Sequence, residues 1–423
     1  MSTTRKFFRI LSLDGGGSWA LIQARALQAL FGQQARGHHI LSRFDLVAAN
    51  SAGSLVLGGL LKDMTLAEIV SLFKDQATRE LLFSRLGLDH LLDRLLQRTL
   101  KLGPQYSTAR KLEGLRVILD ELADTPLDQL TLGPRAAPHL LICGFDYDLK
   151  RATFFRSDRA SLADGKPGKA APTLAHAIHA STNAPVNYFD LPAQFSDDLR
   201  MADRRYWDGA IGGYNNPVLA AVVEALANRA RYHCTPHGIR VLSIGTGSVN
   251  LPMSGIRPAQ SPVLELARGA PCLAKDLDNL ARSIISDPPD AASYTTHLML
   301  GGAVSVSPDA PVKDSPLIRL NPMIQPILGR HAGTPAWCLP KGLTPLQFQQ
   351  LVHLDIDAVE QGEVKLIERF CNAWLADDVP NQTIRYDADF QPLIGHGRFS
   401  DAKAAWEKLA GPTEPPLLRF AAQ

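Results

Sequence analysis

Residues 7–31 read FFRILSLDGGGSWALIQARALQALF, and the pattern changes twice within this segment. The first seven residues are apolar and rich in β-formers, which predicts a buried strand over 7–13. This run stops at Asp14 and three consecutive glycines, and the Ala, Leu and Gln content of 21–31 then predicts a helix. The segment therefore predicts a strand, a glycine loop and a helix in direct succession.

The same order recurs immediately downstream. Residues 44–49 predict a second strand, residues 50–53 a sharp turn and residues 54–61 an apolar helix. Two such units in succession imply parallel strands joined by helical crossovers. We therefore expect an α/β fold with a parallel-rich central sheet and helices on both faces, in three layers.

The rest of the chain predicts further alternation, followed by a change of composition. Strands are expected at 139–145, 152–155 and 239–244, and helices through most of 65–120 and at 173–181 and 218–227. Residues 251–345 are dense in proline and glycine, which predicts long loops that frame a pocket or a lid. One amphipathic helix is expected from Pro345 to Ala376. We expect one domain over 1–345 and a helical C-terminal extension over 346–423 that packs on it.

Composition and charge exclude several classes of protein. The 423 residues are 45% hydrophobic and 20% charged, which is ordinary for a globular chain and unlike a disordered or collagen-like one. The net charge is +2, from 44 basic and 42 acidic residues, and the basic residues form no stripe, so a nucleic-acid polymer is not an expected partner. The five cysteines are far apart and form no CxxC pair, which indicates a reducing compartment.

The chain shows no clear targeting or membrane segment. The apolar run after Arg5 and Lys6 is broken by Arg9 and is too short for a signal peptide. The longest apolar stretch, 44–61, contains polar residues and three glycines, so it reads poorly as a membrane span. We expect a soluble cytoplasmic protein.

The glycine loop Asp14-Gly15-Gly16-Gly17 is a candidate anion site. Consecutive backbone N–H groups without Cβ atoms can point at one anionic oxygen, either a phosphate or a developing oxyanion. The loop is not a Walker motif, because no Gly-Lys-Ser/Thr follows, and its contiguous glycines do not match GxGxxG. A tight turn alone would explain one or two glycines more easily than three.

A candidate nucleophile and a candidate base occur further along. Residues 49–53, ANSAG, resemble a GxSxG nucleophile elbow in which Ala49 replaces the first glycine. Ser51 stands before a helix whose dipole favours negative charge. Ser51 as a simple N-cap is the alternative. Asp208 precedes Gly209 in an expected turn and can accept a serine proton there, although Asp-Gly more often marks a surface turn.

Histidines offer a competing interpretation. The chain has twelve, and His176 and His179 lie three apart on an expected helix, so a Ser–His–Asp triad is conceivable. None of them occurs in a recognisable triad motif, and the metal-binding pattern HExxH is absent. Most are expected to be surface residues or hydrogen-bonded core residues.

The glycine loop, the serine elbow and Asp208-Gly209-Ala210 together resemble the patatin-like phospholipase family in content, order and spacing. Two more segments are similar to that family, namely HASTNAP at 179–185 and VLSIGTG at 241–247. The resemblance is clear over residues 7–250 and loose beyond them. It implies the three-layer patatin-like fold.

The resemblance also implies an activity and a set of site residues. It implies a bacterial type of lipid acyl hydrolase that uses a Ser–Asp dyad without histidine, with Ser51 as the nucleophile and Asp208 as the base. The amides of Gly15, Gly16 and Gly17 would form the oxyanion hole, and no cofactor or metal is implied. Phospholipids or lysophospholipids are the expected substrates, reached by transient contact of the 251–345 loops with a membrane surface.

Several alternative functions stay open, and the chain departs from the family pattern both at Ala49 and after the glycine run. The family usually has an aliphatic residue, a basic residue and a glycine after the glycine run, whereas this chain has Ser18-Trp19-Ala20, and Trp19 is expected in the core. An esterase for soluble or neutral-lipid esters would use the same residues. A phospholipase effector gated by a nucleotide signal, with its switch in 65–120 or the C-terminal segment, is another alternative. A non-catalytic lipid-binding module is a third, against which the presence of both Ser51 and Asp208 argues.

Overall fold

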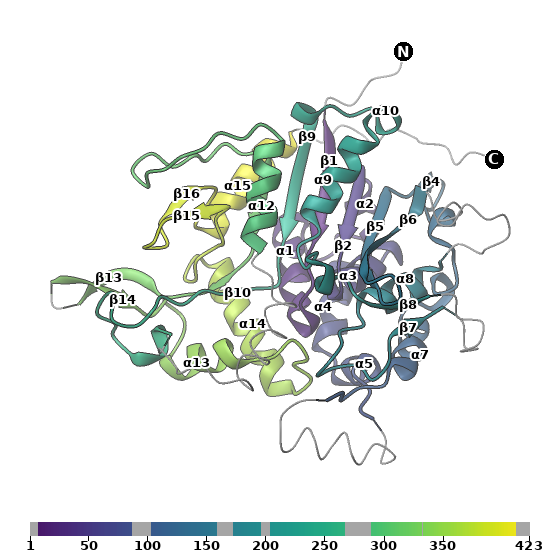
Figure 1. Ribbon diagram of the computed structural model, residues 1–423, viewed down its shortest axis with the longest axis horizontal. Coiled ribbons are helices and arrows are strands. Elements are labelled where there is room, and N and C mark those ends of the chain that lie inside the picture. Colours follow the sequence, from purple (N-terminus) through teal and green to yellow (C-terminus); the bar gives the residue numbers. More distant parts are fainter. Residues whose placement is uncertain are drawn as a thin grey trace.

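A computed structural model describes residues 7–86, 103–158, 172–195, 204–266, 289–331 and 333–411. Its first unit is the predicted one: strand β1 (Phe8–Leu13), the glycine loop, a 3-10 turn η1 (Gly17–Ala20) and helix α1 (Leu21–Phe31). The second unit follows, with β2 (Leu46–Ala49) leading directly into α3 (Ala52–Leu61). Both predicted units are confirmed (Figure 1).

The central sheet is mostly parallel, as predicted. Its parallel part runs in the order β11 (Leu317–Leu320), β9 (Ile239–Ile244), β1, β2 and β5 (His139–Asp146). Beyond β5 the sheet turns antiparallel, since β8 (Arg205–Asp208) and β6 (Arg151–Arg156) both pair antiparallel with β5, and β7 (Ala193–Gln194) pairs with β8. The carboxyl ends of the parallel strands therefore share one edge, which is where ligands bind in open α/β sheets.

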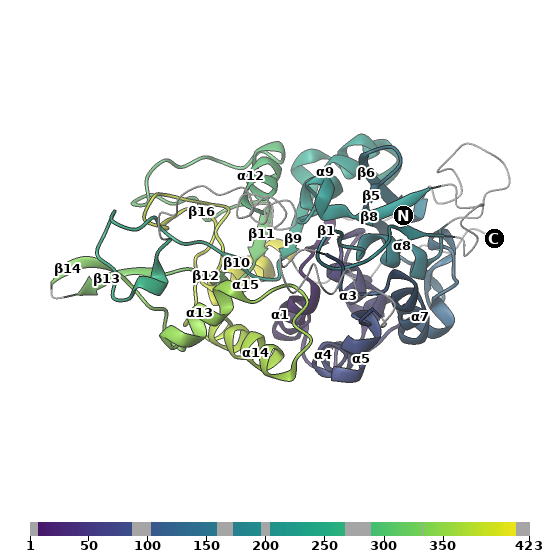
Figure 2. The same cartoon turned by 60° about the horizontal axis from the view of Figure 1, so that its bottom comes forward.

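Two apolar cores lie on opposite faces of this sheet. Alternate residues of the strands point to opposite sides, so Leu11 and Leu13 of β1 join one core while Phe8 and Ile10 join the other. The first core is completed by α1, α3, α4 (Leu66–Lys74), α8 (Leu174–Ser181) and α14 (Gln361–Leu375). The second is covered by α9 (Val218–Ala227) and α12 (Pro289–Met299). Figure 2 shows these helix layers above and below the sheet, which confirms the three-layer prediction.

Several shorter helices complete the helical layers. Residues 65–120 are mainly helical where they are described, while residues 87–102 of that prediction lie outside the described residues. Among the described residues up to 232, the remaining α-helices are α2 (Gly37–Leu41), α5 (Gln76–Leu82), α7 (Thr108–Leu119) and α10 (Arg229–Tyr232). Helix α7 packs against α5 and α8.

The segment 251–345 contains more regular structure than loops alone. It supplies α12, the sheet strand β11, the short strand β12 (Met323–Ile324) and a hairpin of β13 (Ile327–His331) and β14 (Thr334–Cys338). Strand β11 has only four residues and carries Arg319 within its apolar run, so its pattern was too short to predict a sheet strand. Residues 267–288 and 332 of this segment lie outside the described residues.

The prediction of one helix from Pro345 to Ala376 is wrong. The structure has two helices there, α13 (Pro345–His353) and α14, and each begins with a capping box, at Thr344 and at Glu360. The connection between them contains a turn at 356–357 and bonds to the residue after the glycine loop, because the Ser18 N–H donates to the Ile356 carbonyl at 2.8 Å. A tertiary contact thus replaces the helical hydrogen bonds that periodicity alone predicts.

The C-terminal part packs on the domain. After α14 come a two-stranded hairpin of β15 (Arg385–Tyr386) and β16 (Pro392–Ile394), and then α15 (Phe399–Ala410). Helix α14 packs on α1, and α15 packs on β9 and β11. Residues 412–423 of the predicted extension lie outside the described residues, and the division at residue 345 stays a prediction.

Two further findings concern the cysteines and the membrane. The cysteines with described positions, Cys143, Cys234, Cys338 and Cys371, are free thiols, and Cys272 lies outside the described residues. In the described part of the chain, no helix combines the length and the apolar character that crossing a bilayer requires.

Candidate active site

Ser51 occupies a strained turn between β2 and α3. Its backbone angles are φ 47° and ψ −126°, a region that non-glycine residues rarely adopt and that is typically kept where function needs it. The turn is held by the Ser51 N–H, which donates to the Ser181 hydroxyl at 2.8 Å. Gly53 allows the tight return of α3, because a Cβ there would lie 2.5 Å from the Leu13 carbonyl oxygen. The elbow geometry is therefore present despite Ala49.

The sheet register brings Asp208 to Ser51. Strand β5 pairs along one edge with β6, and both Ile142 and Gly144 have β6 partners. On the other edge of β5, the pairing with β2 ends where Ala49 lies opposite Ile142. The pairing with β8 begins two residues further along β5, where Asp208 lies opposite Gly144. Strands β2 and β8 thus share one edge of β5 and run toward each other. Their ends meet where the chain turns at Ser51.

The Asp208 carboxylate is buried and well hydrogen-bonded. It is 2% exposed, and its Oδ1 accepts hydrogen bonds from the Ala210 N–H at 2.9 Å and the Asn50 amide at 3.0 Å. The Ser51 side chain lies near enough to this carboxylate to help lower its pKa. Burial raises the pKa of Asp208 above its ordinary value, while these hydrogen bonds and the charge of Lys111 act in the opposite direction. The structure therefore places the Ser51 hydroxyl near a buried carboxylate.

The glycine loop runs beside this pair, but its three amides differ in their partners. The Gly15 N–H donates to the Asn215 carbonyl at 2.9 Å. The N–H groups of Gly16 and Gly17 meet no protein acceptor within the described part of the chain. A Cβ placed on Gly15 would lie 3.0 Å from the Ser51 Cβ, so the loop and the elbow are in direct contact. Two unpaired amides beside a serine can donate to an oxyanion.

A buried ion pair anchors the start of the glycine loop. The Asp14 carboxylate accepts a hydrogen bond from the Arg319 guanidinium at 2.5 Å, and both side chains are at most 2% exposed. Burial raises the pKa of Asp14, and the charge of Arg319 opposes that shift. Thr246, from the 241–247 segment, donates its hydroxyl proton to the Gly15 carbonyl at 2.6 Å. The loop conformation therefore depends on residues from β9 and β11.

The connection between α13 and α14 closes the site from the C-terminal side. Ile356 lies over Gly17, since a Cβ on that glycine would come within 2.1 Å of the Ile356 carbonyl oxygen. The flanking carboxylates accept hydrogen bonds from two phenols, Asp355 from Tyr188 at 2.5 Å and Asp357 from Tyr106 at 2.6 Å.

Two cavities border these residues. One, of about 30 Å³, lies beside Ser51 and is also lined by Gly17, Lys111 and Ile356. The other, of about 490 Å³, borders Gly15, Gly16 and Trp19, and Ile356 lines it too. The second has the size of a ligand pocket, whereas the first has room only for one or two water molecules.

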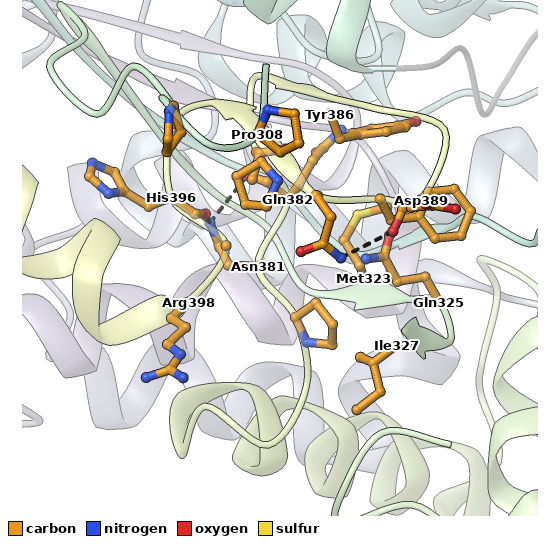
Figure 3. A pocket seen from close by; sticks show the side chains of 18 of the residues that line it. Pro308, Met323, Gln325, Ile327, Asn381, Gln382, Tyr386, Asp389, His396 and Arg398 are labelled. Atoms are coloured by element: carbon orange, nitrogen blue, oxygen red, sulfur yellow. Dashed lines mark hydrogen bonds between the residues drawn. The ribbon is translucent and has the colours of Figure 1, made fainter. Parts of the chain in front are cut away.

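A third cavity, of about 360 Å³, lies in the C-terminal part and shares Met323, Gln382 and Tyr386 with the second. Figure 3 shows Asn381 and Gln382 at its wall. Asn381 ties this wall to β11, because its amide donates to the Arg319 carbonyl at 3.1 Å. Neither Ser51, Asp208 nor the glycine loop lines this cavity.

The competing residues are placed elsewhere. No hydrogen bond joins a described histidine to Ser51 or Asp208. His179 is buried in α8, where burial lowers its pKa well below the ordinary value. Trp19 is 7% exposed and packs edge-on against Phe370, which agrees with its predicted core position, and its indole N–H donates to the Asp355 carbonyl.

Five residues around the site were given no role by sequence reasoning, namely Asn50, Lys111, Ser181, Asn183 and Arg319. Ser181 and Asn183 lie in the quoted 179–185 segment, so that resemblance was a signal for them. Lys111 shares the apolar face of α7 with Leu112 and Leu115, and a lysine on a buried face is a second signal. Arg319 within the apolar strand β11 is a third.

Comparisons with known proteins give one family model and several distant structures, among them the following two. A family model described as patatin-like phospholipase matches residues 11–222, half of the chain. The crystal structure of VipD from Legionella pneumophila aligns with 95% of this chain and 74% of its own, at 11% identity and a TM-score of 0.36. That of the type III effector protein ExoU aligns with 68% of this chain and 53% of its own, at 13% identity and a TM-score of 0.24. A search of curated proteins gave no match.

Proposed function

Since this chain belongs to the patatin-like phospholipase family, we propose that it cleaves fatty-acyl esters of phospholipids or lysophospholipids through a Ser51–Asp208 dyad. The strained turn at Ser51, whose side chain lies beside the buried carboxylate of Asp208, supports this proposal most directly. A backbone kept in a costly conformation between the end of a strand and the start of a helix is typical of a nucleophile elbow.

The proposed reaction has two half-reactions. Ser51 Oγ attacks the ester carbonyl carbon while its proton passes to Asp208, and the resulting oxyanion accepts hydrogen bonds from backbone amides. The intermediate then collapses, and the leaving alcohol, a lysolipid or a glycerol derivative, takes the proton from Asp208. Water next attacks the acyl-enzyme, again giving its proton to Asp208, and the fatty acid leaves as Ser51 regains a proton. No cofactor or metal takes part in these steps.

The hydrogen bonds of the glycine loop limit which of its amides can donate to an oxyanion. Because the Gly15 N–H is already donated to Asn215, we assign the donor role to Gly16 and Gly17 rather than to all three glycines. Gly15 instead lets the loop approach Ser51 and Asn50, whose atoms lie within 3.0 Å of the position that a Cβ would occupy.

Replacement of Gly17 by alanine is expected to lower kcat by about 100- to 1,000-fold, as loss of one oxyanion donor typically does. Gly17 has φ 57°, and a Cβ there would press on the Ile356 carbonyl, so the amide would be displaced. Gly133→Ala is the matched control, because Gly133 has φ 64° but no neighbour within 4 Å of a Cβ. Steady-state kinetics of the two variants decide the point, and a Gly17→Ala enzyme as active as Gly133→Ala contradicts the assignment.

The small volume beside Ser51 favours a second candidate function. A fatty-acyl chain does not fit a cavity of about 30 Å³, whereas a short acyl group needs little more space. An esterase for soluble short-chain esters is therefore the alternative, with the same catalytic residues. The long-chain substrate requires either the 490 Å³ cavity beyond the glycine loop or a movement of Ile356.

The two candidates are separated by a substrate comparison. Mixed phospholipid vesicles and a soluble butyrate ester are incubated with equal amounts of protein, and free fatty acid and lysolipid are measured by mass spectrometry. The proposed phospholipase releases fatty acid and lysolipid from vesicles, and the lysolipid reveals which ester is cut. Hydrolysis of the soluble ester without release from vesicles favours the esterase instead.

We further propose that exposed apolar residues of the segment 251–306 contact the membrane. Ile256, Val304 and Val306 are 67%, 55% and 91% exposed. Inserting one such side chain into lipid stabilises binding by about 1.5–3 kcal/mol, so Ile256→Ser is expected to weaken vesicle binding by about 10- to 150-fold. Val117→Ser on α7 is the control, because Val117 is 68% exposed outside this segment. Equal co-sedimentation of the two variants with phospholipid vesicles would refute the contact.

A further inference from the structure

Lys111 is a buried cation whose position needs an explanation. It lies in the first turn of α7, is 1% exposed and borders the small cavity beside Ser51. Its Nζ donates to the His179 carbonyl at 3.0 Å and to the Asn183 side-chain oxygen at 2.7 Å, and it lies 4.0 Å from the centre of the Phe189 ring. Burying an ammonium group is costly unless its bonds are satisfied and its position has a use.

One acceptor, His179, lies in the last turn of α8, and the other, Asn183, lies two residues beyond its end. This short stretch also bonds to both members of the proposed dyad. The Ser181 hydroxyl accepts the Ser51 N–H at 2.8 Å, which fixes the strained turn of the elbow. Two residues further on, the Asn183 carbonyl accepts the Asp208 N–H at 2.9 Å. The chain from 179 to 183 therefore carries Lys111 on one side and Ser51 and Asp208 on the other.

We propose that Lys111 is a positioning residue for the reaction, which clamps the end of α8 so that Ser51 and Asp208 keep their hydrogen-bonding geometry. This inference rests on the proposed roles of Ser51 and Asp208. A lysine donating to the last carbonyls of a helix also complements the helix dipole, so the clamp stabilises the end of α8 that it holds.

The charge of Lys111 has a second effect on the dyad. The titratable groups that face it are Asp208, Asp190 and His179. Burial lowers the pKa of Lys111 well below its ordinary value, and the two carboxylates oppose that shift. The positive charge lowers the pKa of Asp208 in turn. Its removal therefore leaves Asp208 protonated up to a higher pH.

The test compares Lys111→Met with Lys62→Met in the full chain. Methionine keeps most of the buried volume of lysine but neither its charge nor its N–H donors. Lys62 is the matched control, because its Nζ donates to the Ile118 carbonyl at the end of α7 at 3.0 Å and, within the described residues, makes no hydrogen bond to the α8 end, Ser51 or Asp208. Thermal unfolding of both variants reports any general loss of stability.

Two readouts separate positioning from a purely structural role. The first is the rate at which a fluorophosphonate labels Ser51, which requires no knowledge of the natural substrate. Lys111→Met is expected to lower this rate, and kcat, by about 10- to 100-fold with KM changed by less than about threefold, since small misplacements of reacting groups have effects of this order. The second is the acid limb of the pH–kcat/KM profile, which is expected to move to higher pH in Lys111→Met and to stay in place in Lys62→Met.

The outcomes that overturn the inference are distinct from failure of the proposed function. A wild-type chain that is not labelled at Ser51 contradicts the dyad itself and the clamp with it. A labelled wild type with unchanged labelling and acid limb in folded Lys111→Met overturns the clamp alone. If Lys111→Met does not fold, Ser181→Ala replaces it, because it removes only the link to Ser51. Slower labelling of Ser181→Ala supports the proposal that the end of α8 positions Ser51. Labelling of Ser181→Ala at the wild-type rate overturns it.

Discussion

Ser51→Ala is expected to lower ester hydrolysis by roughly 10,000- to 1,000,000-fold, the effect of removing the nucleophile from a serine hydrolase. Only the Oγ atom is lost. The Ser51 N–H still donates to Ser181, and the elbow keeps its contacts with the glycine loop. The variant is therefore expected to fold and to bind substrate, while no acyl-enzyme forms.

Activity and unfolding temperature are measured together on this variant and on Ser293→Ala. Ser293 is a suitable control because it lies in α12 rather than in the elbow. Its side chain is fully buried, and its hydroxyl accepts a hydrogen bond from the Asn216 side-chain amide. Ser293→Ala is expected to keep its activity. Comparable activity in the two variants would show that another residue is the nucleophile.

The second large effect is expected from Asp208→Asn. Loss of a general base typically costs about 100- to 10,000-fold in kcat. The asparagine oxygen can still accept the N–H groups of Ala210 and Asn50, so the loop after β8 is expected to remain in place. What is lost is the ability to take the Ser51 proton.

Stability is expected to change in the opposite direction to activity. Burial raises the pKa of Asp208 above its ordinary value, so the ionised carboxylate is less favourable in the folded chain than in the unfolded one. A neutral asparagine avoids this cost. The unfolding temperature of Asp208→Asn at neutral pH is therefore expected to equal or exceed that of the wild type, and a markedly lower temperature together with lost activity would indicate a structural role instead.

The same raised pKa determines the pH dependence of the wild type. Asp208 must be ionised to accept the serine proton, so kcat/KM is expected to fall as the pH drops through its pKa, above the ordinary range of an aspartate. Asp146→Asn is a matched buried control, since Asp146 is 1% exposed and accepts the Leu149 N–H. Its acid limb is expected to match that of the wild type.

Contiguous patterns explain what could be predicted from the sequence. The strand, glycine loop and helix of residues 7–31 form one segment, and so do β2, Ser51 and α3, so local propensity and the order of elements were sufficient. Asp208 was found through its place in a family pattern, and the sheet register brings it to the end of β2.

The parts that were missed depend on contacts between distant segments. Arg319 bonds to Asp14 across 305 residues of sequence, and the Ile356 carbonyl accepts the Ser18 N–H. Lys111 bonds to residues 68 and 72 positions away. Helical periodicity predicted one helix through residues 354–360. The periodicity shows which face is apolar, but it does not show which backbone groups form hydrogen bonds with distant segments.

The most direct test measures fatty acid release from mixed phospholipid vesicles by the wild type, Ser51→Ala and Asp208→Asn at equal concentration of folded protein. The Ser51–Asp208 dyad predicts release by the wild type, release by Asp208→Asn that is lower by about 100-fold or more, and release by Ser51→Ala near the level of the protein-free control. A Ser51→Ala variant that releases fatty acid at the wild-type rate would contradict it.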